Sequence, residues 1–555
     1  MTMRSGGRIL VDQLRIHGTS HVFCVPGESY LAVLDALHDS PIRTIVCRQE
    51  GGAAYMAEAA GKITGRPGIV MVTRGPGATN ASCGIHVAAQ DSTPLIMFVG
   101  QVARGMRDRE AFQEIDCRAV FGSMAKWVAE IDRAERIPEI VSRAFHVATQ
   151  GRPGPVVIAL PEDMLADRVE AADALTFAPA VMKPGAADME ALRQRLLGAS
   201  RPILIAGGSG WSAQGVRDLV RFAETFDLPA AVSFRRQMLF PADHPNFAGD
   251  VGIGPNPKLV ERVKTADFVL LVGGRLSEMP SQGYTLLDIP GDGSKLVHIH
   301  PGAEELNKVH RAGLGILATP HAFAAAAAEL PKPDAVPWAG AAGAAHAEYL
   351  AWSDTAKIKT AGNLQMAGVM AHLKEAMPAD TVYCNGAGNY ATWVHRFWPF
   401  RAFGSQLAPT SGTMGYGVPA SVAAKALLPH REVIAFAGDG CFMMNGQEFA
   451  TLMQYGLPVI VVVVDNGMYG TIRMHQEREY PNRVSATGLR NPDFAALARA
   501  HGGHGETVQH TAEFGPALER ARGSGKPAII HCLPDPEAIT PARSLTDIRN
   551  AALAK

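Results

Sequence analysis

Two oxygen-bearing side chains follow buried strands in the last third of the chain. Gly438-Asp439-Gly440 ends the apolar run that starts at Val433, and Asn466 follows the β-branched run Val459–Val464. Parallel strands bring their carboxyl ends to one edge of a sheet, where open α/β sheets bind ligands. A carboxylate and a carboxamide at this edge suit Mg²⁺, which takes protein oxygens together with substrate phosphates. Backbone N–H groups of a glycine-rich turn add a binding place for a diphosphate.

The residues after Asp439 carry a helix-start pattern. Gly438 and Gly440 predict a tight turn with close backbone approach. Asn445 with Glu448 three residues later predicts a capping box at the start of a helix. The alternative role for Asp439 is to cap a turn, and the second oxygen ligand at the next strand end favours the metal site.

The elements that must position these residues recur along the whole chain. Short apolar runs without alternation are followed by glycine-rich turns and alanine-rich helical stretches, as in Gly68–Thr73 and Phe268–Val272. This pattern predicts an α/β fold of three doubly wound parallel-sheet domains. The expected boundaries are 1–178 and 188–330 for the first two domains, 331–360 for a linker, and 361–545 for the third.

Composition excludes several classes of protein. The 555 residues are 47% hydrophobic and 19% charged, which is typical of a folded chain. The 52 basic and 53 acidic residues give a formal charge of −1, so we expect no nucleic-acid or membrane partner. Seven scattered cysteines without a C-x-x-C pair predict reduced thiols and a cytoplasmic location. We expect neither a signal peptide nor a membrane span.

The segment from Gly438 to Asn466 resembles the diphosphate-binding motif of thiamine-diphosphate enzymes, which reads G-D-G, helix, strand and N-N. Asp465 replaces the first Asn, and Cys441 stands where the family often has Ser. The resemblance implies that Asp439, Asn466 and the backbone carbonyl of Met468 bind Mg²⁺. It also implies that Gly438, Gly440 and Cys441 lie against the diphosphate of the cofactor.

Matching segments occur in the first third. Glu50 precedes a Gly/Ala-rich helix and resembles the family's glutamate, which shares a proton with the aminopyrimidine ring of the cofactor. Taken alone, Glu50 is better explained as a helix-start carboxylate favoured by the helix dipole. Arg74–Asn80 resembles the family's G-P-G-x-x-N segment, which implies that Pro76 and Asn80 line the pyrimidine side.

Two further segments of the last third match the family. Asn385–Tyr390 resembles its second diphosphate-binding turn, with Gly388, Asn389 and Tyr390 in the matching places. Ser411–Pro419 resembles G-x-M-G-x-G-x-P. There the resemblance implies that the Gly412 carbonyl meets the aminopyrimidine and that Met414 wedges between the two cofactor rings, a role suited to an unbranched side chain.

The resemblance covers nearly the whole chain and implies a homo-oligomer, at least a dimer. Family members place the pyrimidine domain of one subunit against the diphosphate domain of another, so Glu50 and Asp439 of one active site would belong to different chains. Some members bind FAD at the central domain, and the sequence does not decide whether this chain does.

The closest resemblance is to acetolactate synthases and related enzymes acting on 2-oxo acids. It implies substrate contacts for Phe112, Gln113 and Lys126, and a carboxylate contact for Arg275, which can form two parallel hydrogen bonds. A surface ion pair is the alternative for Arg275. The implied reaction decarboxylates a 2-oxo acid such as pyruvate and adds the remaining two-carbon unit to a second carbonyl.

Departures from the synthases keep other reactions open. His475 stands where synthases have a Trp, and Arg473 adds a cation nearby. Glu28 follows Pro26-Gly27, where the family's decarboxylases use an acid in proton transfer, although their adjacent His pair is absent from residues 104–125. The alternatives are therefore a non-oxidative 2-oxo acid decarboxylase and, from another class, a non-catalytic cofactor-binding subunit.

Overall fold

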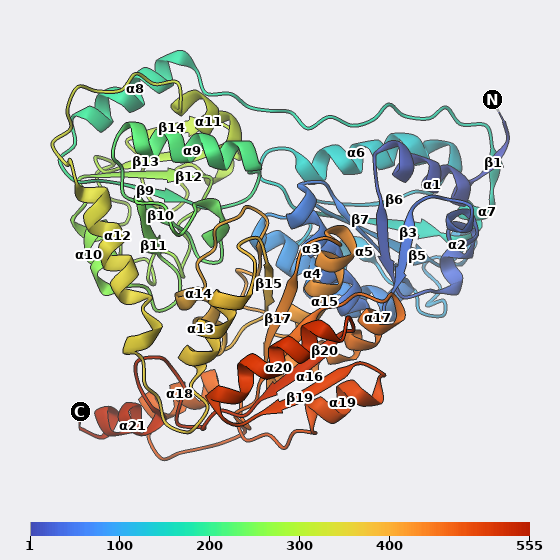
Figure 1. The fold of residues 1–555 in the computed structure, drawn as a ribbon. Coiled ribbons are helices and arrows are strands. Elements are labelled where there is room, and N and C mark those ends of the chain that lie inside the picture. The colour runs from blue at the N-terminus through green and yellow to red at the C-terminus, as the bar shows by residue number, and fades with distance from the viewer. Residues whose placement is uncertain (1, 555) are drawn as a thin grey trace. The chain divides into compact units, whose positions relative to one another are not determined.

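Three six-stranded parallel sheets form the framework of the protein (Figure 1). The computed structural model describes residues 2–554. Every strand pair in the three sheets is parallel, and a two-stranded antiparallel pair, β1 (Arg4–Ser5) with β8 (Arg168–Val169), stands apart from them. The prediction of three doubly wound α/β domains is confirmed.

The first sheet is built from short apolar runs that leave few side chains exposed. In spatial order its strands are β3 (Arg43–Val46), β2 (His21–Cys24), β4 (Gly68–Thr73), β5 (Leu95–Gln101), β7 (Pro155–Pro161) and β6 (Trp127–Glu130). Its helices are α1 (Gly6–Ile16), α2 (Leu31–His38), α3 (Glu50–Thr64), α4 (Arg74–Asp91), α5 (Cys117–Phe121), α6 (Ile137–Thr149) and α7 (Glu162–Ala166). Helix α3 starts where the Gln49 side chain accepts from the Gly52 N–H and ends at left-handed Gly65.

The central sheet has the order β11 (Phe247–Asp250), β10 (Ala230–Val232), β9 (Pro202–Ala206), β12 (Phe268–Val272), β13 (Leu296–His300) and β14 (Leu314–Leu317). Its helices are α8 (Ala186–Leu197), α9 (Ala213–Thr225), α10 (Pro257–Thr265) and α11 (Pro320–Ala327). The expected linker 331–360 contains α12 (Ala341–Trp352), where the Tyr349 ring packs edge-on against Phe247 at 4.7 Å between centroids. This part of the expected linker therefore packs on the central sheet.

The third sheet has the order β16 (Gln406–Leu407), β15 (Val382–Asn385), β17 (Val433–Gly438), β18 (Ile460–Val464), β20 (Ala528–Cys532) and β19 (His504–Val508). Its segment also contains α13 (Met366–Ala376), α14 (Ala391–Phe397), α15 (Gly417–Leu427), α16 (Asp439–Asn445), α17 (Phe449–Gln454), α18 (Gly470–Glu479), α19 (Phe494–Ala500), α20 (Thr511–Gly523) and α21 (Leu545–Leu553). Strand β18 is a β-branched run buried on both faces, as the sequence predicts for a central parallel strand.

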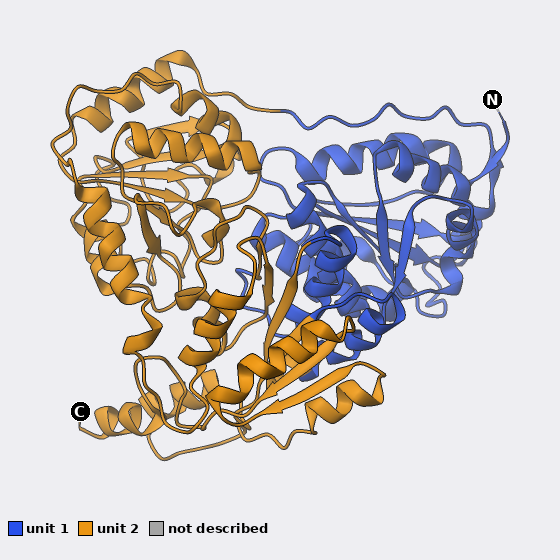
Figure 2. Cartoon of the chain, viewed as in Figure 1, with its two compact units in different colours: residues 1–180, 409–430, 443–459 blue, residues 181–408, 431–442, 460–555 orange. Residues whose placement is uncertain are grey.

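By mutual contacts the chain divides into two compact units rather than three (Figure 2). The first unit joins the first 180 residues to residues 409–430 and 443–459, and the second unit holds the rest. Helices α15 and α17 thus group with the first sheet, where α15 packs on α3. The domain boundaries expected from sequence stay predictions.

Candidate active site

Asp439 and Asp465 converge at one edge of the third sheet. Gly438 pairs with Val464 at the ends of β17 and β18, so the next residue of each strand lies at the same edge. The Asn491 amide donates to Asp439 Oδ2 at 2.7 Å and to Asp465 Oδ1 at 2.8 Å. We call these two carboxylates the acid pair. Asn466 is half-buried directly beyond Asp465, and Met468 follows two residues later.

The electrostatics of the acid pair fit a cation site. Burial raises the pKa of Asp439 to about 6, and the neighbouring charge of Asp465 acts in the same direction. Burial also acts to raise the pKa of Asp465, but hydrogen bonds from His531, the Gly467 N–H and Asn491 leave it lowered. Among the residues the structure describes, no Lys or Arg forms an ion pair with Asp439. Of the two acids, His531 pairs with Asp465 alone, which leaves the Asp439 carboxylate available, and an oxygen-rich edge of this kind suits Mg²⁺.

The expected second diphosphate turn lies against the same edge. The Asn389 N–H donates to Thr471 Oγ1 at 3.1 Å, and the Thr471 hydroxyl donates to Asn389 Oδ1 at 2.9 Å. The Tyr390 hydroxyl pairs with Cys441 Sγ at 3.1 Å. A Cβ at Gly438 would lie 2.8 Å from the Tyr390 ring, so only glycine fits there. The structure therefore brings the two predicted diphosphate segments together.

Two local expectations around Asp439 are wrong. The chain passes from β17 into α16 at Asp439 itself, without the tight turn expected at Gly438–Gly440. The expected capping box is also absent, since Asn445 ends α16 and makes no side-chain cap. Glu448 instead accepts from the Arg48 N–H at 2.9 Å and the Gln49 N–H at 3.0 Å, directly before Glu50. The Glu448 carboxylate therefore binds backbone N–H groups remote in sequence instead of a cap on its own helix.

Glu50 is the first residue of α3 and meets a predicted neighbour. The Asn80 amide donates to Glu50 Oε2 at 2.9 Å. A Cβ at Gly77 would lie 3.6 Å from Glu50 Oε1, so Gly77 stands beside the carboxylate. The structure thus joins two of the expected pyrimidine-side residues, Glu50 and Asn80, while the role of Pro76 stays a prediction.

The Arg74 guanidinium links Glu28 to the expected substrate segment. Its Nη1 lies 3.4 Å from Glu28 Oε1 and donates to the Phe112 carbonyl at 3.3 Å, and its Nη2 pairs with Glu162 at 2.7 Å. The Gly75 N–H donates to the Gln113 carbonyl at 2.8 Å. Phe112 is 73% exposed, and Arg74 and Gln113 both have positive φ. Strained backbone of this kind gathers at functional sites.

The remaining expected substrate residues make contacts within the chain. The Lys126 ammonium donates to the carbonyls of Gln150 and Arg152 at 2.6 and 2.7 Å. Arg275 is half-buried after β12. Arg473 pairs with Glu477 at 2.5 Å, and burial with the charge of Arg478 lowers the pKa of His475. Their expected substrate roles stay predictions.

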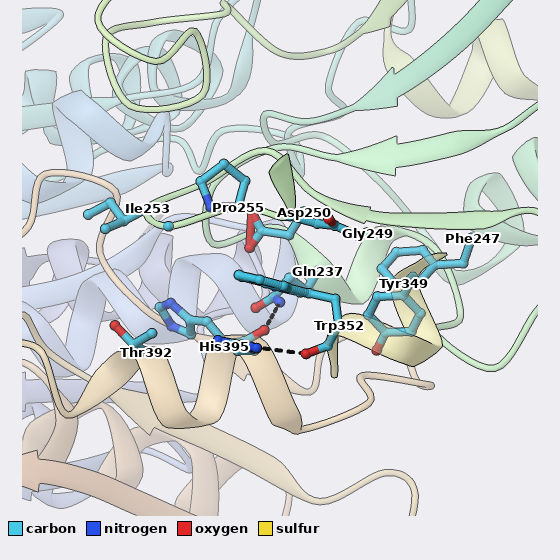
Figure 3. Close-up of a pocket in the computed structure, with 13 residues that line it drawn as sticks. Gln237, Phe247, Gly249, Asp250, Ile253, Pro255, Tyr349, Trp352, Thr392 and His395 are labelled. Atoms are coloured by element: carbon cyan, nitrogen blue, oxygen red, sulfur yellow. Dashed lines mark hydrogen bonds between the residues drawn. The ribbon is translucent and has the colours of Figure 1, made fainter. Parts of the chain in front are cut away.

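A separate pocket in the second unit contains none of the predicted site residues. Figure 3 shows Trp352, Asp250 and His395 around it, with the Arg396 Nε donating to the Trp352 carbonyl at 3.0 Å. Burial raises the pKa of Asp250 to about 7 and lowers that of His395.

Two features are absent from residues 2–554. No cluster of three or more His, Cys, Asp and Glu suited to a metal occurs there, and the expected Mg²⁺ ligands are of another kind, with one carboxylate, one amide and one carbonyl. No described helix combines the length and apolar character needed to cross a membrane.

Sequence reasoning missed Asn491, His531 and Thr471. His531 Nε2 lies 3.0 Å from Asp465 Oδ2. Each comes from an element remote in sequence from the motif that it supports. The sequence offered a signal for His531 alone, which is its position in β20, the strand that pairs with β18.

Comparison with known proteins gives three family matches in chain order. The models are "Thiamine pyrophosphate enzyme, N-terminal TPP binding domain" at residues 4–120, "central domain" at 189–327 and "C-terminal TPP binding domain" at 386–532. Similar curated proteins include the acetolactate synthase isozyme 2 large subunit of Escherichia coli, 30% identical over 95% of both chains. The acetolactate synthase large subunit of Lactococcus lactis is 32% identical over 90% of this chain and 87% of its own.

Proposed function

The chain belongs to the thiamine pyrophosphate enzyme family, and on this basis we propose that it is a thiamine-diphosphate- and Mg²⁺-dependent carboligase of the acetolactate synthase type. Its donor would be a 2-oxo acid such as pyruvate. The observation that carries the proposal is the acid pair, two buried carboxylates on one amide without Lys or Arg, within the segment matched as a TPP binding domain.

The residues predicted to bind the cofactor have separate tasks in this reaction. Asp439, Asn466 and the Met468 carbonyl bind Mg²⁺, and Gly388, Asn389 and Tyr390 border the diphosphate. Glu50 holds a proton at the aminopyrimidine, oriented by the Asn80 amide. When bound, thiamine diphosphate supplies the nucleophilic carbon and the electron sink that allow carbon dioxide to leave a 2-oxo acid.

The fate of the two-carbon unit depends on residues beyond the cofactor. Arg275 binds the carboxylate of a second 2-oxo acid, which favours carboligation. The position of Glu28 after Pro26-Gly27 supports a second candidate, simple decarboxylation, because an acid that reaches the two-carbon unit can deliver a proton in place of the second carbonyl.

Product analysis with pyruvate tests the proposal. Protein stripped with a chelator should lose activity and regain it with Mg²⁺ plus thiamine diphosphate, and it should yield acetolactate. Acetaldehyde alone would favour decarboxylation, and cofactor binding without any product would favour a non-catalytic subunit. Arg275→Ala should reduce acetolactate formation more than carbon dioxide release, and equal losses would refute its assigned role.

Glu50→Gln separates cofactor binding from chemistry. The amide cannot hold the proton, so turnover should fall by about 10²–10⁴-fold while affinity for thiamine diphosphate stays within a few-fold. Titration calorimetry and initial rates measure the two quantities. An unchanged rate would exclude Glu50 from proton transfer.

We also propose a homo-oligomer whose active sites lie between subunits, in a cytoplasmic compartment that keeps the seven free cysteines reduced. Co-expression of Glu50→Gln with Asp439→Asn tests the arrangement. A hybrid dimer then contains one intact site, so the mixture should regain about a quarter of wild-type activity. No recovery would place both residues of a site on one chain.

A further inference from the structure

A buried ion cluster in the first unit joins α3 to α4. The Lys62 ammonium lies 3.0 Å from Glu58 Oε1 and contacts Asp91 Oδ2. The Lys62 side chain is 6% exposed, and those of Glu58 and Asp91 are fully buried. We call Glu58, Lys62 and Asp91 the buried triad. Its two acids surround their own cation, so it has no need of a metal.

The two acids of the buried triad also bind a segment far along the chain. The Tyr416 hydroxyl donates to Glu58 Oε2 at 2.6 Å, and the Thr410 N–H donates to Asp91 Oδ1 at 2.7 Å. The Lys62 ammonium also stands over the Tyr416 ring, 5.0 Å from its centroid. One turn before Glu58 on α3, the Tyr55 hydroxyl pairs with Thr413 Oγ1 at 2.9 Å. Residues 410–416 are thus tied to α3 and α4 at three points.

Gly412 and Met414 lie between these points. Gly412 has a left-handed φ of 71°, and a Cβ there would meet nothing within 4 Å, so its peptide borders open space. Gly415 also has a positive φ, 77°. A short segment with two left-handed glycines has many alternative conformations, and fixed contacts at both ends select one of them.

Burial makes the energy of these contacts depend strongly on their geometry. A buried carboxylate that loses a hydrogen bond is left with an unmet charge, so each acid strongly favours the geometry in which all its partners are present. Charged groups are not needed merely to hold α3 against residues 410–416, because apolar side chains could pack there with similar stability. A charged cluster instead specifies where Thr410 and Tyr416 must stand.

We propose that the buried triad is a positioning device that sets the Gly412 carbonyl and the Met414 side chain for the aminopyrimidine of the cofactor. This inference rests on the proposed function, because it takes the pyrimidine contacts of Gly412 and Met414 from there. The triad residues touch no substrate and act only through Thr410 and Tyr416.

Tyr416→Phe tests the proposal with the loss of one oxygen atom. Hydrogen–deuterium exchange of the amides of residues 410–414 should accelerate about tenfold in the cofactor-free protein. In the loaded enzyme, exchange of the reactive carbon-bound proton of thiamine diphosphate should slow by a similar factor. Affinity for Mg²⁺ and thiamine diphosphate should change less than threefold, since the acid pair is untouched.

Tyr383→Phe is the matched control. The Tyr383 hydroxyl is buried in β15 and has no hydrogen-bond partner among the described residues, so its removal breaks no contact. It should leave both exchange rates unchanged. If Tyr416→Phe does not fold, Thr410→Val removes the hydrogen bond from the Thr410 hydroxyl to Asp91 and serves in its place.

The possible results distinguish the positioning role of the triad from the proposed function. Lower thermal stability of Tyr416→Phe with unchanged amide exchange at 410–414 would overturn the positioning role and leave a purely structural one. Faster amide exchange with an unchanged proton-exchange rate on the cofactor would overturn it as well. If the wild-type protein binds no thiamine diphosphate, the proposed function fails and the positioning role fails with it, while Tyr416→Phe amide exchange still reports whether the triad fixes the segment.

Discussion

The acid pair and the buried triad are two carboxylate clusters that differ in how their negative charge is balanced. In the triad, Lys62 stands between Glu58 and Asp91 and neutralises much of their charge. In the acid pair, an uncharged amide, Asn491, bridges Asp439 and Asp465. Of these two acids, His531 pairs with Asp465 alone, and the pKa of Asp439 rises to about 6.

This difference indicates which of the two clusters is suited to bind a ligand. A buried acid without a cation raises the free energy of the cofactor-free protein, and binding of the proposed Mg²⁺ would remove that cost. A cluster with its own cation gains nothing from a metal and can only maintain geometry. The comparison therefore assigns ligand binding to the sheet edge in the second unit and positioning to α3 and α4 in the first.

The largest expected effect comes from changing one acid in each cluster. Asp439→Asn should weaken Mg²⁺-dependent binding of thiamine diphosphate about 10²–10³-fold, because the main anionic ligand is lost. The metal-free variant should be slightly more stable than wild type, because the repulsion with Asp465 is relieved. Titration calorimetry and thermal unfolding measure both effects.

Asp91→Asn is the matched change in the triad. It leaves Lys62 with one acid fewer and should lower the free energy of unfolding by about 3 kcal/mol, with Mg²⁺ affinity within threefold of wild type. If the two variants shift affinity and stability in the same direction, the contrast between the clusters is wrong.

A smaller effect is expected at Asn491. Its amide hydrogen-bonds both acids and is not one of the expected metal ligands. The loss of such a partner commonly costs 10–100-fold in metal affinity, so Asn491→Ala should weaken the proposed Mg²⁺ binding by about that factor. Magnesium titration at a fixed concentration of thiamine diphosphate measures it. An unchanged affinity would show that the acid pair is oriented by β17 and β18 alone.

The strands and the residues at their ends could be predicted from the sequence. Runs such as Val461–Val464 are buried on both faces, so the parallel sheets, with the strand ends before Asp439 and Asp465 at one edge, could be predicted from local pattern. The pairing of Glu50 with Asn80 also joins two motifs that the family resemblance had named.

Partners remote in sequence could not be predicted. Glu448 fits a capping pattern locally, yet its carboxylate accepts from the backbone of Arg48 and Gln49, about 400 residues earlier. Asn491 belongs to a loop before α19 with no motif of its own, and Glu58 and Lys62 resemble an ordinary helical ion pair. Tertiary packing decides these contacts, and a single sequence does not encode them in a local pattern.

The smallest expected effect concerns a third carboxylate cluster, which by the same reasoning should be structural. Glu477 on α18 pairs with Arg473 and, through two bonds of 2.8 Å, with Arg549 on α21. Ile548 of α21 and Met474 of α18 pack in the same place. Hydrogen bonding from Arg549 lowers the pKa of Glu477 to about 2.

Because the folded-state pKa of Glu477 lies below its ordinary value of 4.5, its stabilising effect is complete above pH 4.5 and is lost only as the pH falls towards 2. Amide protection of α21 in the wild type should therefore stay constant from pH 7 to 4.5. Arg549→Met should reduce that protection several-fold at every pH in this range and leave Mg²⁺ affinity unchanged. If the affinity instead falls as it does for Asp439→Asn, then neutralised charge does not distinguish structural clusters from the ligand site.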